Sequence, residues 1–293
     1  MICSIILNNL RMRITIPNLN NDEDANRYWV VKTQIQKNYD IVLLGDSRVY
    51  RGISPATMVQ SMPGVRILNF AYSSGGLNQY MYAEADSKLD PNSSRKAIII
   101  GLSPAALTEF SSNNAAYMAE KTRSIDYIVS NYLFPGAQDF ISPLNNKISD
   151  YYQLTKKMKD YYQEFYDDGW VASWTIPEDR SALTSYKEVF KTRKVSTELV
   201  QQFTDQTAFW RENHITVFAF RMPTDPQMVI LENKSSGFDE NHISKQFEKN
   251  GGIWLDFSNE TYHSYDGSHL DKDSAVKFSQ DLSAQIAQYM NNK

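Results

Sequence analysis

A serine and a histidine-carboxylate pair in this chain have the residue types and the spacing of a nucleophile and its base. Ser47 stands just beyond the apolar run Ile41–Leu44, at the end of an expected strand. A serine hydroxyl becomes a strong nucleophile only when a base removes its proton, and the usual base is a histidine oriented by a carboxylate. Asp266 precedes His269 by three residues, so the carboxylate can reach the imidazole within one loop turn. The pattern predicts a triad of Ser47, His269 and Asp266.

Such a triad requires strands that end at the same edge of a sheet. The run before Ser47 is too short for a helix and is unbroken by polar residues, which is typical of a strand buried on both faces of a parallel sheet. Strands of this kind are expected at Ile41–Leu44, Val65–Ala71, Lys96–Gly101, His214–Phe220 and Gly252–Phe257. With helices between them they predict an α/β fold, a three-layer α/β/α sandwich with a five-stranded parallel sheet of the flavodoxin-like type.

Capping residues indicate where the helices begin. Ser54 and Pro55 are typical of the N-cap and the first residue of a short helix, so a loop of several residues is expected between Ser47 and that helix. Further helices are expected to end at about Lys37 and to occupy Asn78–Leu89, Thr197–Glu212, Glu240–Asn250 and Asp273–Met290.

The alternation of strands and helices is interrupted in the middle of the chain. We interpret residues 111–195 as a mostly helical cap inserted into one domain that spans residues 1–293. Aromatic and apolar residues recur there at helical spacing, which favours an amphipathic helix packed on the body over an aromatic platform for sugars. These residues are Tyr151, Leu154, Met158, Tyr161, Tyr162 and Phe165. Long insertions at the carboxyl-end face of a sheet often form the walls of a site.

Composition excludes some classes of function. The formal net charge of -4 argues against a nucleic-acid partner. The single cysteine, Cys3, excludes an internal disulfide framework. No cluster of histidine, cysteine and carboxylate residues has the spacing of metal ligands, so no metal or organic cofactor is expected. The apolar segment Met1–Leu7 is short and lacks a preceding basic region, and we interpret it as neither a signal peptide nor a transmembrane helix.

Three motifs together resemble the SGNH (GDSL-type) hydrolase superfamily. They are the Gly-Asp-Ser that ends at Ser47, the glycines Gly75 and Gly76 after the second strand, and Asp266-x-x-His269 before the final helix. The resemblance covers residues 38–110 and 200–290. It implies that Ser47 is the nucleophile, that His269 is first a general base and then an acid, and that Asp266 orients the imidazole.

The resemblance also implies where an oxyanion hole would lie. In this family the donors are the N–H of the nucleophile, a glycine N–H after the second strand, for which Gly75 is the first choice, and an asparagine side chain after the third strand. Gly-Leu-Ser-Pro at Gly101–Pro104 stands where Gly-x-Asn is expected. Loss of one donor lowers the rate on the order of 100- to 1,000-fold. Either Ser103 substitutes, or a donor comes from elsewhere, or hydrolysis is not the physiological reaction.

Further motifs look like one branch of this superfamily, whose members modify bacterial surface polymers. Gly-x-Ser-Arg-Val, Gly-Ile-Ser-Pro, Arg-x-Pro after the fourth strand and Asp-Gly-Ser-His-Leu carry this resemblance. The branch includes alginate O-acetylation proteins and the D-alanyl-lipoteichoic-acid protein, which are often membrane-anchored and work beside a membrane-bound O-acyltransferase. It implies an extracytoplasmic or cell-envelope location. It also implies roles in substrate binding for Arg48, Gly76 and Arg221, with a surface or salt-bridged arginine as the alternative at each arginine.

The sequence therefore favours a serine-dependent esterase or O-acyltransferase that acts on acyl esters, of the acetyl class, of a carbohydrate or surface glycan through an acyl-Ser47 intermediate. The alternative is a non-catalytic glycan-binding or assembly protein with the same fold that partners a membrane O-acyltransferase. A nucleotide-binding protein is a more distant alternative, because glycines follow a strand but the Gly-x-Gly-x-x-Gly spacing is absent.

Overall fold

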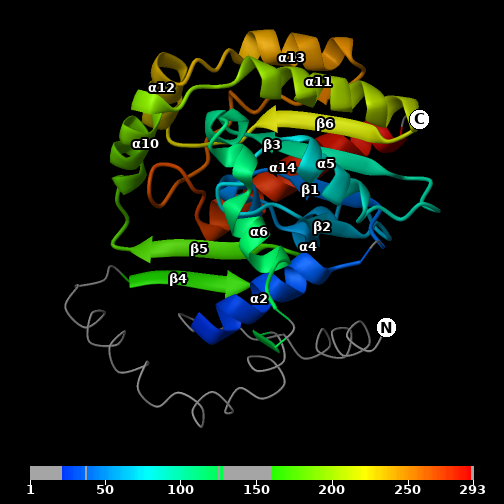
Figure 1. The fold of residues 1–293 in the computed structure, drawn as a ribbon, viewed down its shortest axis with the longest axis horizontal. Coiled ribbons are helices and arrows are strands. Elements are labelled where there is room, and N and C mark those ends of the chain that lie inside the picture. Colours follow the sequence, from blue (N-terminus) through cyan, green and yellow to red (C-terminus); the bar gives the residue numbers. More distant parts are fainter. Residues whose placement is uncertain (1–21, 37, 125, 128–159, 292–293) are drawn as a thin grey trace.

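The structure is a computed structural model that describes residues 22–36, 38–124, 126–127 and 160–291. Its centre is a parallel sheet of five strands in the order β2-β1-β3-β6-β7 (Figure 1). These strands are β1 Ile41–Leu44, β2 Ile67–Asn69, β3 Ala97–Leu102, β6 Thr216–Arg221 and β7 Ile253–Trp254. Counted along the chain, this is the 2-1-3-4-5 arrangement of flavodoxin-like sheets. The predicted fold class is confirmed.

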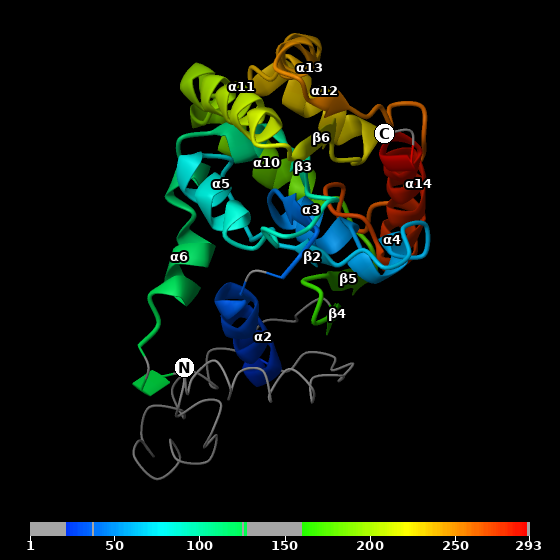
Figure 2. The same ribbon diagram turned by 90° about the vertical axis from the view of Figure 1, so that its right-hand side faces the viewer.

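Helices cover both faces of the sheet, because successive side chains of each buried strand point to opposite sides. Ile41 and Leu43 of β1 belong to one core cluster, and Val42 and Leu44 belong to the other. The first cluster is closed by α3 Ser47–Gly52, α4 Pro55–Met58 and α14 Lys272–Asn291. The second is closed by α5 Gln79–Asp86, α11 Thr197–Glu212 and α13 Glu240–Lys249 (Figure 2). This accounts for the three layers.

The other described elements lie around this body. They are α2 Asp22–Gln34, the short 3-10 helices η1 Pro104–Leu107 and η2 Ser111–Asn113, α6 Ala115–Lys121, α10 Ser181–Thr192 and α12 Pro226–Ser235. The sequence did not predict α12, although Asp225 caps it and Pro226 is its first residue. No helix among the described residues has both the length and the apolar character that crossing a membrane would require.

The middle of the chain contains a β-hairpin as well as helices. β4 Asp160–Phe165 pairs antiparallel with β5 Val171–Ile176. The amphipathic helix predicted through Tyr161, Tyr162 and Phe165 is therefore wrong for this part, and its beginning at residues 151–159 lies outside the described residues. In a run so dense in aromatic residues, helical and strand spacings are both satisfied, and pairing with β5 decides the outcome.

Ser47 is the first residue of α3 and does not lie in a loop, so that prediction is also wrong. Asp46 caps this helix, since its Oδ1 accepts a hydrogen bond from the Arg48 N–H at 2.9 Å. Gly45 has a φ of +149°, and a Cβ there would lie 2.7 Å from the Gly101 carbonyl oxygen. The chain thus turns sharply from β1 into a helix that begins with the nucleophile candidate.

Candidate active site

The structure brings the three residues of the predicted triad together. Ser47 Oγ lies 2.8 Å from His269 Nε2. On the other side of the ring, His269 Nδ1 lies 2.7 Å from Asp266 Oδ2. Asp266 Oδ1 accepts the backbone N–H groups of Ser268 and His269, each at 2.8 Å. One carboxylate therefore shapes the loop and fixes the imidazole, so that a proton on Nδ1 leaves Nε2 free to accept the serine hydroxyl.

The electrostatic surroundings keep this histidine neutral. Burial lowers the pKa of His269, and the positive charge of Arg51 lowers it further, against the opposing effect of Asp266. Burial alone would raise the pKa of Asp266, but hydrogen bonds from His269 and the backbone lower it to about 2. At neutral pH the pair is thus an imidazole and a carboxylate, the protonation states that a general base and its orienting group need.

Ser103 does not offer its hydroxyl to the site. The Ser103 Oγ donates a short hydrogen bond to Asp46 Oδ2, and the residue is fully buried. The same oxygen accepts the Ala106 N–H at the start of η1. Ser103 therefore joins the end of β3 to the helix cap before Ser47, and its predicted role as an oxyanion donor is not supported.

The N–H groups of Gly75, the predicted oxyanion donor, and of Gly76, predicted to bind substrate, are engaged as well. The Gly75 N–H donates to the Tyr72 carbonyl at 3.0 Å, and the Gly76 N–H donates to Asn114 Oδ1 at 2.8 Å. Within the described part of the chain, the N–H groups of residues 73–74 in the same loop have no such partner. A hydrogen-bond donor from this loop would thus come from those exposed residues and not from the glycines.

Glu232 pairs with both Arg48 and Arg221, and Arg221 Nη1 also lies 3.1 Å from Glu240 Oε2. Arg48 Nη2 lies 2.6 Å from Glu232 Oε1, and the Arg48 side chain is 1% exposed. Arg221 Nη2 lies 2.8 Å from Glu232 Oε2. Both arginines thus form salt bridges inside the protein, which was the alternative at each position, and their role in substrate binding stays a prediction. Arg48 Nε also donates to Ser268 Oγ at 3.0 Å, which supports the residue next to His269.

A second arginine on α3 stands beside the triad, and sequence reasoning missed it. Arg51 Nη1 donates to the Tyr265 hydroxyl at 3.1 Å. The Tyr265 ring stacks on the His269 ring at 5.9 Å between centroids. Arg51 follows Ser47 by one helical turn. Prediction of helix α3 from the sequence would therefore have placed Arg51 on the same helix face as Ser47.

The middle of the chain also borders the catalytic loop. The Asp179 N–H donates to the Tyr265 carbonyl at 3.0 Å, and the Ala182 N–H donates to the Asp266 carbonyl at 3.2 Å. The Tyr161 ring of β4 lies 6.3 Å from the Tyr265 ring. Described parts of the predicted insertion therefore adjoin the triad.

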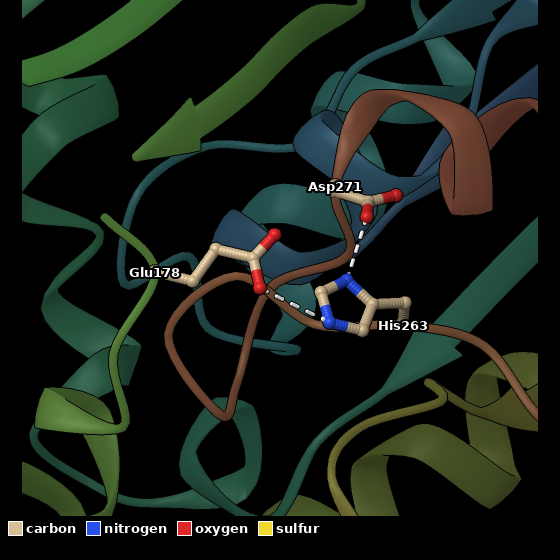
Figure 3. Close-up of side chains that lie close together, drawn as sticks. All are labelled: Glu178, His263 and Asp271. Atoms are coloured by element: carbon tan, nitrogen blue, oxygen red, sulfur yellow. Dashed lines mark hydrogen bonds and ion pairs between the residues drawn. The ribbon is translucent and has the colours of Figure 1, made fainter. Parts of the chain in front are cut away.

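A different cluster of histidine and carboxylates lies on the surface (Figure 3). Glu178, His263 and Asp271 place their ligand atoms within 4.8 Å of one another. His263 Nε2 is 3.2 Å from Glu178 Oε2, and His263 Nδ1 is 2.7 Å from Asp271 Oδ2. Both ring nitrogens thus have a carboxylate partner. The cluster links the segment before α10 to the residue before α14.

Comparisons with known proteins give only distant likenesses. No family model matches the chain, and no curated protein matches it. A proposed lipolytic protein of the G-D-S-L family from Desulfitobacterium hafniense DCB-2 is similar over 84% of this chain and 98% of that one, with 12% identity and a TM-score of 0.39. A proposed platelet activating factor from Streptococcus pneumonia is similar over 99% and 98%, with 9% identity and a TM-score of 0.38. Est24, a carbohydrate acetylesterase from Sinorhizobium meliloti, is similar over 86% and 100%, with 11% identity and a TM-score of 0.35.

Proposed function

We propose that this chain is a serine esterase of the SGNH type. The observation that carries the proposal is the continuous line of hydrogen bonds from Ser47 through His269 to Asp266, at 2.8 and 2.7 Å. Its members come from two segments far apart in the sequence that follow β1 and β7 at one edge of a parallel sheet. That edge is where α/β proteins of this kind place their reactive groups.

The geometry supports a two-step acyl transfer. His269 Nε2 takes the proton of the Ser47 hydroxyl as Oγ attacks the ester carbonyl, and the C–O bond to the alcohol breaks as the imidazolium returns that proton to the leaving oxygen. Asp266 stabilises the imidazolium meanwhile. In the second step His269 takes a proton from water or from an acceptor hydroxyl as its oxygen attacks the acyl carbonyl. The bond from the acyl carbon to Ser47 Oγ then breaks as the imidazolium returns that proton to Oγ. Water as acceptor makes the protein a hydrolase, and a sugar hydroxyl makes it an O-acyltransferase.

The substrate class that we propose is an acyl ester, of the acetyl class, of a carbohydrate or surface glycan. The aromatic residues of β4 beside the catalytic loop suit the apolar faces of sugar rings. A membrane-bound O-acyltransferase partner and a cell-envelope location are proposals that rest on the sequence motifs alone. A non-catalytic glycan-binding protein is the second candidate, and it is favoured by one observation: Gly75, Gly76 and Ser103 are all engaged in internal hydrogen bonds.

A fluorophosphonate tests whether the serine is activated. We expect one adduct per wild-type chain, located on Ser47 by mass spectrometry, because only this hydroxyl has a histidine base at hydrogen-bond distance in the described structure. The adduct should be absent from Ser47→Ala and from His269→Ala. Ser61→Ala, which removes an exposed hydroxyl, is the matched control and should label as the wild type does. A folded wild-type protein that takes no adduct would favour the binding candidate.

The pH dependence of kcat/KM reports the pKa of the general base, His269. Because the pKa of His269 is lowered, the imidazole stays neutral below its usual value of about 6.5, so the acidic limb of the profile should lie below that pH. The positive charge of Arg51 opposes protonation, and its removal in Arg51→Gln should therefore move the acidic limb to higher pH. Initial rates with a neutral ester between pH 4 and 8 measure both positions. An acidic limb above pH 7 in the wild type would contradict the role of His269.

A further inference from the structure

Arg51 carries a partly buried positive charge that no carboxylate of the described residues neutralises at salt-bridge distance. Its Nη1 donates to the Tyr265 hydroxyl, and its Nε is buried with no hydrogen-bond partner in residues 22–36, 38–124, 126–127 and 160–291. Arg48 on the same helix is also buried, but Glu232 Oε1 lies 2.6 Å from it. Arg48 Nη1 also lacks a hydrogen-bond partner among the described residues, so the two sites differ in the counter-ion: Arg48 has a carboxylate in contact, whereas the charge of Asp266 acts on Arg51 only from beyond salt-bridge distance.

Three tyrosines from three segments surround the guanidinium. Its Cζ lies 5.2 Å from the ring centroid of Tyr50 and 5.7 Å from that of Tyr161, and Tyr265 accepts its hydrogen bond. The Tyr161 hydroxyl is itself buried and has no hydrogen-bond partner within the described part of the chain. Arg51 of α3 and Tyr161 of β4 are neighbours, and each has a hydrogen-bond donor, Nε and the hydroxyl respectively, that lacks an acceptor among the described residues.

These groups stand next to the reacting atoms. Residues one turn apart share a helix face, and helical side chains lean back toward the N-terminus, so Arg51 extends toward the Ser47 end of α3. Tyr265 bonds Arg51 and stacks on His269. A group bound at Arg51 would therefore lie beside the ester that Ser47 attacks.

We propose that Arg51, together with Tyr161 and Tyr265, binds a carboxylate of the substrate, so that the preferred substrate is an ester that carries a negative charge close to its acyl carbon. This rests on the proposed function of Ser47 and names the substrate class of the same site. A carboxylate supplies both the counter-charge and the acceptor lone pairs that these donors lack. It can belong to the acyl group, as in a succinyl ester, or to the alcohol, as in an acylated uronic acid.

Two matched pairs of esters distinguish these sources. The first pair is a monosuccinyl ester and its methyl-capped neutral counterpart, and the second is an O-acetylated methyl glucuronoside and the corresponding glucoside. We expect the wild type to show a KM roughly 10- to 100-fold lower for the charged member of one pair, the range of one charge-assisted hydrogen-bond pair. Arg51→Gln should abolish that difference, and Arg51→Lys should retain part of it. Arg95→Gln is the control and should leave the difference unchanged, because Arg95 is exposed and donates to the Gly64 carbonyl. No preference in the wild type, or an undiminished preference in Arg51→Gln, overturns the proposal.

Binding to a Ser47→Ala protein separates this inference from the proposed function. Calorimetry with the charged ester should show binding that the neutral ester lacks and that a Ser47→Ala/Arg51→Gln protein loses. If the fluorophosphonate labels Ser47 but neither charged ester binds more tightly than its neutral counterpart, the carboxylate site is wrong and the esterase stands. If the charged ester binds through Arg51 while Ser47 is never labelled, the carboxylate site stands and the esterase is wrong.

Discussion

His269→Ala should lower kcat for ester hydrolysis by roughly 10⁴- to 10⁶-fold, the largest effect on activity expected for any single residue apart from Ser47. The substitution removes the group at 2.8 Å from Ser47 Oγ that accepts the hydroxyl proton and later returns it to the leaving alcohol. Asp266→Asn should cost about 10⁴-fold, because an amide can fix the wrong imidazole tautomer and leaves the imidazolium without its counter-charge. Steady-state rates with an activated ester measure both.

The remote histidine of α13 provides the control for this result. His242 is exposed, and His242→Ala should change kcat by less than a few-fold. Because Ser47 and His269 act as one unit, the double variant Ser47→Ala/His269→Ala should be no slower than either single variant. Additive losses would show that the two residues serve different steps. Retention of activity in Ser47→Ala would place the nucleophile elsewhere.

The sheet could be predicted because each of its buried strands is recognisable from its own short run of apolar residues. Ile41–Leu44 and Ala97–Leu102 are apolar or glycine at every position, and both are fully buried in the structure. A strand covered on both faces needs no information from distant segments to be recognised. The hairpin is different, since Asp160–Phe165 becomes a strand through its pairing with Val171–Ile176. Nothing in the six residues alone selects that outcome.

The triad could be predicted for a related reason. The spacing of Asp266 and His269 is a local property of one loop, and the position of Ser47 at a strand end is a local property of one turn. Whether an arginine of α3 forms a salt bridge is not a local property of the sequence. Arg48 and Arg51 lie on one short helix, yet Glu232 of α12 forms a salt bridge with the first, and no described carboxylate lies at salt-bridge distance from the second. Only the packing of α12 and β4 against α3 decides which arginine is structural and which is available.

Substitution of the carboxylate between Arg48 and Arg221 should have the largest effect on stability. Glu232→Ala should lower the free energy of unfolding by about 3–5 kcal/mol, because it leaves Arg48 buried without a counter-charge and leaves Arg221 with Glu240 alone. The Glu232 side chain is 0% exposed, and its two oxygens lie 2.6 and 2.8 Å from the arginine nitrogens. Equilibrium unfolding in urea measures the loss.

Glu188→Ala is the matched control for that loss. Glu188 pairs with Lys191 at 2.6 Å on the surface of α10, where both side chains are about 60% exposed, and such pairs contribute about 0–1 kcal/mol. A loss in Glu232→Ala no larger than in Glu188→Ala would show that Arg48 and Arg221 reach water when the carboxylate is gone. Because Arg48 also holds Ser268 beside His269, the Glu232→Ala protein should lose kcat under conditions in which it is still folded. Full activity in the folded variant would mean that the loop keeps His269 in place without Arg48.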